Sequence, residues 1–178
     1  MPFSVLLLTA ASPERHLSGY GGDRVRMQGD LLPDELVLFF DKIDSDSVRN
    51  SLGMANKCCD GIIFHSHDKQ VIICLVEMKS DDLGKAEKQV KDTYEHLRKM
   101  LSAECMHCKD KLPQIIWRAY IYRSGGGPKK DAEACVRSLE KAGFKSGNVA
   151  VLGNPDITEF LREGISNWRQ KASKRRTH

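Results

Sequence analysis

Two apolar runs separated by a short polar loop form the clearest pattern along this chain. The segments GIIF and QVIICLVEMK, at residues 61–64 and 70–79, are rich in Val and Ile, which indicates strands covered on both faces. The loop HSHDKQ is too short for a crossover, so the two strands are expected to pair as an antiparallel hairpin. A turn centred on Asp68 and Lys69 would place Asp60 directly opposite Glu77.

The rest of the chain alternates between helical and strand patterns. Helices are predicted over residues 80–104, 129–143 and 156–172, and strands over 114–123 and 148–153. The first of these helices carries an apolar stripe at three- and four-residue steps: Leu83, Ala86, Val90, Tyr94, Leu97 and Leu101. The expected caps are Ser80 or Asp81, then Gly143 and Asp156. Residues 35–43 (ELVLFFDKI) fit either a short helix or a strand. This order predicts an α/β domain with a mixed β-sheet flanked by helices.

The N-terminal segment and the cysteines indicate whether the protein is secreted or remains in the cytoplasm. MPFSVLLLTAAS lacks the basic region of a secretory signal and is interpreted as part of the core. Cys74 lies inside an apolar run, and Cys58 adjoins Cys59, which favours buried free thiols over a disulfide framework. We therefore expect a cytoplasmic protein with residues 1–178 in a single domain.

The amino-acid composition and the charge distribution indicate which classes of partner this chain could bind. The chain is 40% hydrophobic and 29% charged, typical of globular proteins, and no apolar run approaches the ~20 residues needed to cross a bilayer. No membrane partner is expected. The net charge is only +4, but the C-terminal tail WRQKASKRRTH is basic without a single acid, and it suits either a polyanion or simple solvation.

Charged residues at one end of the predicted hairpin are the strongest chemical signal. Residues facing each other across an antiparallel pair project to the same side with Cβ atoms ~5 Å apart, so Asp60 and Glu77 would repel without a cation. Lys79 follows Glu77 by two residues and leaves on the same face. Two carboxylates and a neighbouring backbone carbonyl form an oxygen-rich site suited to Mg²⁺ or Mn²⁺. The plainer alternative is a surface ion pair at a strand end.

The segments CCDGIIF and ICLVEMKS, followed by a helix containing KQVKDTY, resemble the PD-(D/E)XK nuclease superfamily. Its signature is an Asp, a β-hairpin and then E-x-K on the second strand. The resemblance implies a restriction-endonuclease-like core. It implies that Asp60, Glu77 and the carbonyl of Met78 hold the metal and that Lys79 is the catalytic lysine. The residue before Asp60 is Cys59, where the family name has a Pro.

The helix after the hairpin resembles that of RecB-like members, which often carry a Gln before a Tyr. Gln89 and Tyr94 stand in this region, one residue further apart than usual. Gln89 lies at the flank of the apolar stripe and could reach a substrate, whereas Tyr94 lies within the stripe and is expected in the core. The family also has an acidic residue from its first helix, for which Glu14 and Glu35 both qualify.

Three further motifs have both a chemical and a plain interpretation. Cys105 and Cys108 form a C-x-x-C pair, but no second pair completes a zinc site. His65 and His67 are expected to be exposed in the hairpin turn. The glycine-rich SGGGPKK lacks the Lys-Ser/Thr ending of a P-loop, although Lys129 and Lys130 at the start of a helix could contact a phosphate backbone.

These patterns together predict a metal-dependent nuclease that acts on DNA rather than RNA, through attack of a metal-activated water on a phosphodiester. A domain of 20.0 kDa has limited surface for gripping a duplex, so a homodimer or a partner subunit is expected. The alternatives are a non-catalytic nucleic-acid-binding or regulatory module on the same fold, and a small-molecule-sensing α/β domain in which the cluster has no role.

Overall fold

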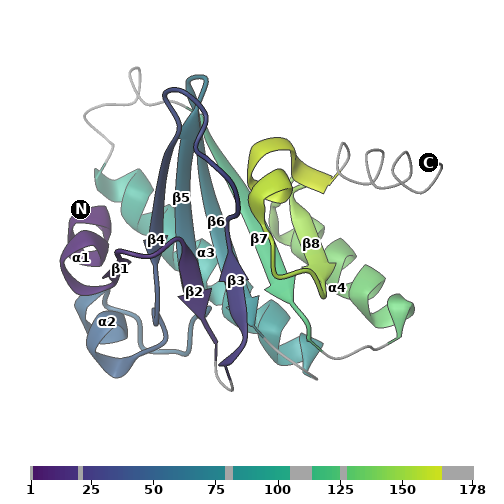
Figure 1. Ribbon diagram of the computed structural model, residues 1–178. Coiled ribbons are helices and arrows are strands. Elements are labelled where there is room, and N and C mark those ends of the chain that lie inside the picture. The colour runs from purple at the N-terminus through teal and green to yellow at the C-terminus, as the bar shows by residue number, and fades with distance from the viewer. Residues whose placement is uncertain (1, 20–21, 79–81, 105–113, 125–127, 166–178) are drawn as a thin grey trace.

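The computed structural model describes residues 2–19, 22–78, 82–104, 114–124 and 128–165. Six strands form one mixed sheet in the order β1-β4-β5-β6-β7-β8, and β2 and β3 form a separate two-stranded sheet (Figure 1). The elements, in chain order, are α1 (Pro2–Thr9), β1 (Ala11–Ser12), β2 (His16–Ser18), β3 (Arg24–Arg26), β4 (Leu36–Phe40), α2 (Asp46–Ser51), β5 (Gly61–His67), β6 (Gln70–Met78), α3 (Leu83–Glu104), β7 (Ile115–Tyr122), α4 (Lys129–Ala142) and β8 (Val149–Leu152). A further helical segment covers residues 158–165.

The central hairpin has the predicted register. Gly61 pairs with Val76 and His67 with Gln70, so β5 and β6 are antiparallel around the turn at Asp68 and Lys69. Both turn residues adopt positive φ, 47° and 63°, and this left-handed backbone matches the right-handed twist of the flanking strands. The next facing positions beyond the ladder are Asp60 and Glu77.

The remaining strands make the sheet mixed. β4 pairs antiparallel with β5, which identifies residues 36–40 of the ambiguous segment as a strand. β7 pairs parallel with β6 after a crossover that contains α3, and β8 pairs parallel with β7 after a crossover that contains α4. The predicted α/β class and its mixed sheet flanked by helices are confirmed.

Each face of the sheet has its own apolar core. Helices α1 to α4 lie over one face, where Leu6, Val48, Val90 and Leu139 are buried (Figure 1). The β2–β3 sheet and the 158–165 helical segment cover the opposite face. Strand alternation therefore decides whether a side chain of β5 or β6 meets the helices or the small sheet.

Most expected details of the elements are confirmed. The stripe residues Ala86, Val90, Tyr94 and Leu97 are buried, and Gly143 ends α4 with φ 119°. Asp156 accepts a hydrogen bond from the backbone amide of Thr158 in the first turn of the last helical segment. Ser80 and Asp81 lie outside the described residues. The carboxylate of Asp82 accepts a hydrogen bond from the amide of Lys85 and so caps α3.

The N-terminal segment is core only in part. Leu6 of α1 is fully buried, whereas Leu7 and Leu8 are 51% and 87% exposed. The described cysteines are all buried and free, as expected: Cys58, Cys59, Cys74 and Cys135. Among the described helices, none combines the length and the apolar character needed to cross a membrane.

Candidate active site at one end of the central hairpin

Asp60 and Glu77 come together where β5 begins and β6 ends. The backbone amide of Asp60 donates to Oε2 of Glu77 over 3.2 Å. In return, Oδ2 of Asp60 accepts from the backbone amide of Met78 over 2.7 Å. Two reciprocal bonds thus hold both carboxylates in place beyond the last ladder pair.

The two carboxylates lie on the helix-covered face of the sheet. Their neighbours at two-residue spacing, Ile62 and Leu75, belong to the core under the helices, and the side chain of Met78 belongs to the opposite core. Glu77 is fully buried and Asp60 is half-buried. A buried carboxylate needs hydrogen bonds or a cation to offset its lost hydration, and the amide of Asp60 supplies one such bond.

Helix α3 docks against the segment that leads into Asp60. Gln89 is 4% exposed, and its Nε2 donates to the carbonyl oxygen of Cys58 over 2.7 Å. Its Oε1 has no hydrogen-bond partner among the described residues. Gln89 therefore holds the chain directly before Asp60 with one end of its amide, and its expected contact with a substrate stays a prediction.

Thr93 is a second contact from α3 that the sequence analysis missed. Its hydroxyl accepts from the backbone amide of Cys59 over 2.9 Å and donates to the carbonyl of Gln89 over 2.7 Å. Thr93 is fully buried one helical turn after Gln89. A hydroxyl residue four positions after a buried Gln, on the same helix face, is the signal that could have found it.

The two thiols next to the site, Cys58 and Cys59, are buried and have raised pKa values. Burial is the largest cause that raises the pKa of Cys58, to about 12, and the carboxylate of Asp44 adds to it. The pKa of the fully buried Cys59 thiol is also raised, first by burial, then by the neighbouring Cys58 and by the carboxylates of Glu77 and Asp60. Both cysteines therefore remain neutral thiols at ordinary pH.

Of the candidate lysines, the structure describes only Lys129 and Lys130. Lys79 lies outside the described residues. Lys129 and Lys130 are exposed in the first turn of α4, which packs on β8 and α3 rather than on β5, and Lys129 lies 3.7 Å from Glu133. The C-x-x-C pair and the basic tail also lie outside the described residues.

Both candidate acids from the N-terminal region are away from the carboxylate pair. Glu14 is exposed and pairs with His16 at 2.9 Å. Glu35 precedes a strand instead of belonging to a helix, and it contacts His65, near the opposite end of β5 from Asp60. Neither residue completes the site.

The expected exposure of His65 is wrong. His65 belongs to β5 and is 2% exposed, because the hairpin turn comprises only Asp68 and Lys69. His67 is partly exposed at the end of the same strand. The side-chain Nε2 of His65 lies 2.7 Å from Oε1 of Glu35, and since a carboxylate only accepts, this nitrogen carries the proton.

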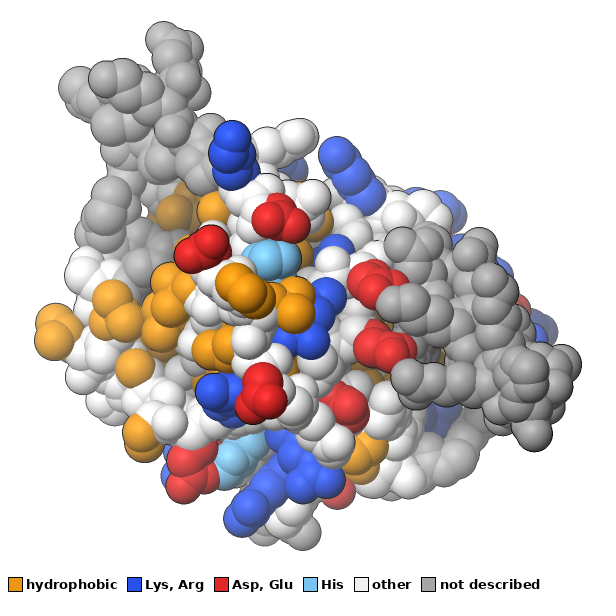
Figure 2. Space-filling view, turned by 45° about the horizontal axis from the view of Figure 1, so that its top comes forward, with side chains coloured by type: hydrophobic (Ala, Val, Ile, Leu, Met, Phe, Trp, Pro, Cys, Tyr) orange, Lys and Arg blue, Asp and Glu red, His pale blue; other side chains and the backbone are white. Residues whose placement is uncertain are grey.

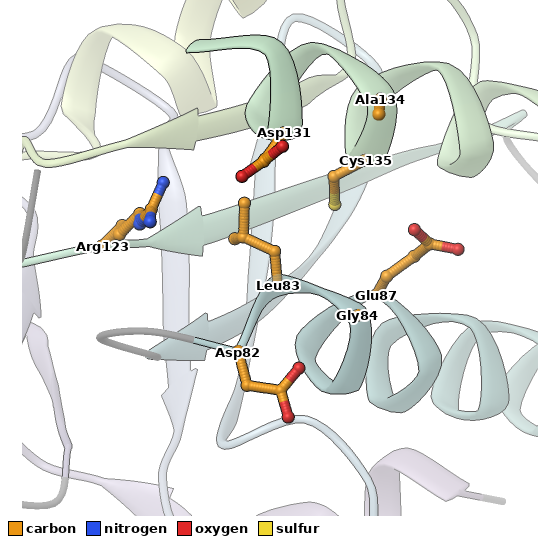
Figure 3. Close-up of a pocket in the computed structure, with 8 residues that line it drawn as sticks. All are labelled: Asp82, Leu83, Gly84, Glu87, Arg123, Asp131, Ala134 and Cys135. Atoms are coloured by element: carbon orange, nitrogen blue, oxygen red, sulfur yellow. The ribbon is translucent and has the colours of Figure 1, made fainter. Parts of the chain in front are cut away.

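A pocket opens beside the carboxyl ends of β6 and β7, between the starts of α3 and α4. Figure 3 shows the residues that line it: Asp82, Leu83, Gly84, Glu87, Arg123, Asp131, Ala134 and Cys135. Glu87 is held by Lys91 at 2.6 Å and by the hydroxyl of Ser138 at 2.7 Å, which ties α3 to α4. Of the residues predicted for catalysis, the two that the structure describes, Asp60 and Glu77, do not line this pocket.

Donor chemistry decides which ligand the pair could hold. Two carboxylates offer only oxygen, and each carboxylate has about four lone-pair positions, enough to accept an amide hydrogen and ligate an ion. Such hard donors match Mg²⁺ and Mn²⁺. Among the described residues, no three His, Cys, Asp or Glu side chains are grouped so that they could hold a metal ion.

Comparison with protein-family models, with curated proteins and with solved structures finds no match to this chain.

Proposed function

We propose that this chain is a metal-dependent nuclease of the PD-(D/E)XK type with a restriction-endonuclease-like core. The observation that carries the proposal is the reciprocal pairing of Asp60 and Glu77 at one end of an antiparallel hairpin. The order of elements supports it, because the β5–β6 hairpin is followed by α3 and then by the parallel strand β7. This is the order that the resemblance implies.

Asp60, Glu77 and the backbone carbonyl of Met78 are the proposed holders of Mg²⁺ or Mn²⁺. A divalent ion bound there would supply Lewis-acid polarisation of a phosphoryl oxygen. The chain's own part is positioning: the amides of Asp60 and Met78 orient the two carboxylates before any ligand arrives. Lys79, two residues after Glu77, keeps the role of catalytic lysine, which orients the attacking water and stabilises developing negative charge.

The proposed substrate is a phosphodiester of nucleic acid, and DNA is proposed rather than RNA. Gln89 is retained as a substrate-side residue because its Oε1 is buried without a partner among the described residues. Lys129 and Lys130 are retained only as outlying backbone contacts, since α4 does not cover β5. The homodimer or partner subunit stays a prediction, which sedimentation with and without DNA would test.

Cleavage by wild type, Asp60→Asn and Lys79→Gln tests the proposal. We expect wild type to cut plasmid or single-stranded DNA in Mg²⁺ or Mn²⁺ and not in EDTA, and both variants to lose at least ~100-fold in rate. Asp68→Asn is the matched control, because it removes one carboxylate at the exposed opposite end of the same hairpin. It should cut like wild type.

Absence of cleavage by folded wild type in either metal would overturn the nuclease. DNA binding that persists in Asp60→Asn without any cleavage by wild type would instead favour a non-catalytic binding module on this fold.

A further inference from the structure

The β2–β3 sheet has one apolar face and one polar, basic face. Leu17 and Val25 are fully buried against the main sheet. Ser18 pairs with Arg24 and His16 with Arg26, so these four side chains project to the opposite, outer side. Arg24 and Arg26 are both exposed.

Close packing fixes the position of this small sheet relative to Asp60. Gly61, the residue directly after Asp60, lies so near Leu17 that an added Cβ would come 2.5 Å from Cδ1 of that leucine. At the turn end of the sheet, a Cβ on Gly19 would come 3.1 Å from Sδ of Met78. The small sheet thus contacts the two strands of the candidate site immediately beside Asp60 and Glu77.

Backbone bonds hold the other edge of the small sheet. The amide of Arg26 donates to the carbonyl of Pro155 over 2.8 Å, and the amide of Ile157 donates to the carbonyl of Arg26 over 3.0 Å. The Arg24 backbone is fixed from the turn side, where the amide of Gly19 donates to the carbonyl of Asp23 over 2.7 Å. Backbone hydrogen bonds on both sides therefore hold β3, the strand that carries Arg24 and Arg26, in place.

Neither Arg24 nor Arg26 forms an ion pair with another described residue, whereas Arg49 and Arg162 are each paired with carboxylates. The Arg26 guanidinium donates to the side-chain amide oxygen of Gln28 over 3.1 Å, but this partner is neutral and leaves the charge of Arg26 uncompensated. The nearby acid Glu14 pairs with His16. Figure 2 shows Lys and Arg side chains gathered with a His at the lower end of the view, with Asp or Glu side chains beside them, at the end where β2 and β3 lie in Figure 1.

We propose that the outer face of the β2–β3 sheet, through Arg24 and Arg26, contacts the phosphate backbone of DNA that enters the candidate active site. Guanidinium groups bind phosphates by charge-assisted, often bidentate hydrogen bonds, which suits two arginines that have no carboxylate partner among the described residues and that lie on alternate positions of one strand. The inference rests on the proposed nuclease function. It adds a substrate contact on the face of the sheet opposite to α3.

Binding of a fluorescein-labelled 20-base-pair DNA duplex in EDTA, followed by anisotropy at several NaCl concentrations, tests the contact without cleavage. Arg24→Gln/Arg26→Gln is compared with Lys99→Gln/Lys141→Gln, which also removes two exposed positive charges. Lys99 and Lys141 lie in the later turns of α3 and α4. The candidate site lies at the end of the sheet where these two helices start, so both lysines are distant from it. Circular dichroism verifies that all variants are folded.

We expect the arginine variant to lose at least ~10-fold in affinity at ~100 mM salt, with a salt slope smaller by about 2. The lysine variant should lose less than ~2-fold. Equal effects of the two variants, no effect of the arginine variant, or no DNA binding by wild type would each overturn the inference. If the arginine variant loses affinity for an RNA duplex of the same sequence but binds the DNA duplex like wild type, the inference is also overturned.

The two proposals fail in different ways. Wild type that binds DNA through the arginines yet never cleaves in Mg²⁺ or Mn²⁺ overturns the nuclease and supports the contact. Wild type that cleaves, with unchanged affinity and rate in Arg24→Gln/Arg26→Gln, overturns the contact and supports the nuclease.

Discussion

At the scale of single residues, the position of Asp60 depends on side chains that hold the backbone immediately before it. The chain before Asp60 is held at two successive positions, by Gln89 at the carbonyl of Cys58 and by Thr93 at the amide of Cys59. Both contacts come from buried polar side chains on α3. Thr93 is in this sense a positioning residue, because it acts on Asp60 only through the backbone.

Replacing Thr93 should separate this positioning role from simple packing. Thr93→Val keeps the shape but leaves the buried amide of Cys59 without a partner, which costs about 1–3 kcal/mol. Thr93→Ser keeps the hydroxyl and loses one methyl, at about 1 kcal/mol. We expect the free energy of unfolding, measured by urea denaturation, to be highest in wild type, lower in Thr93→Ser and lowest in Thr93→Val. We also expect kcat to fall in Thr93→Val with KM nearly unchanged. Equal stability and kcat in the two variants would contradict the role.

At the scale of elements, the important relation is between the central hairpin and the β2–β3 sheet. Gly61 is required because Leu17 occupies the space where a side chain would be, and Leu17 is itself fully buried. The sequence shows a Gly directly after the proposed catalytic Asp, but a glycine within an apolar strand gives no indication of which segment approaches it.

Gly61→Ala should push the small sheet away from β5 and destabilise the fold by about 1–3 kcal/mol, the usual cost of overpacking. Gly61→Ala/Leu17→Ala should lose less than the sum of its single variants, because the shortened leucine makes room. Gly84→Ala is the control: the nearest neighbour of its added Cβ is Oδ1 of Asp82 at 3.6 Å, and Ala favours the helix by about 1 kcal/mol. Additive effects of Gly61→Ala and Leu17→Ala in thermal or urea denaturation would show that the contact is absent.

At the scale of the whole molecule, one buried ionic cluster joins the beginning and the end of the chain. Arg162 donates to both carboxylate oxygens of Glu35, at 2.9 and 2.6 Å, and His65 approaches the same carboxylate. The bond from Arg162 is the largest cause that lowers the pKa of Glu35, to about 2. Burial is the largest cause that lowers the pKa of His65, and Arg118 and Arg162 add to it against the opposing effect of Glu35.

Both shifts make stability fall with acidification. A group with a lowered pKa in the fold binds more protons when unfolded, so the free energy of unfolding decreases as pH falls, below about 6.5 for His65 and from about 4.5 to about 2 for Glu35. In Glu35→Gln the dependence between about pH 4.5 and 2 should become shallower, and the variant should be less stable at pH 7, because the Arg162 guanidinium loses its carboxylate. Urea denaturation across this range measures both effects. If the free energy of unfolding depends on pH in the same way in wild type and in Glu35→Gln, Glu35 is not the source of this pH dependence.

The sequence by itself determined the hairpin and its register. A two-residue turn at Asp68 and Lys69 and period-2 alternation leave only one pairing that puts the apolar residues in the core, and that pairing brings Asp60 opposite Glu77. The stripe of α3 was equally readable, because an amphipathic pattern repeats over many turns.

Tertiary structure alone decided what surrounds that pair. Whether residues 36–40 form a strand depended on the neighbouring β5, and the burial of His65 depended on Glu35 and Arg162, which are distant in sequence. The approach of β2 and β3 to Gly61 depended on packing across the sheet. Local pattern fixes which face a side chain takes, but contacts between distant segments are set by the packing of whole elements, which no single stretch of sequence encodes.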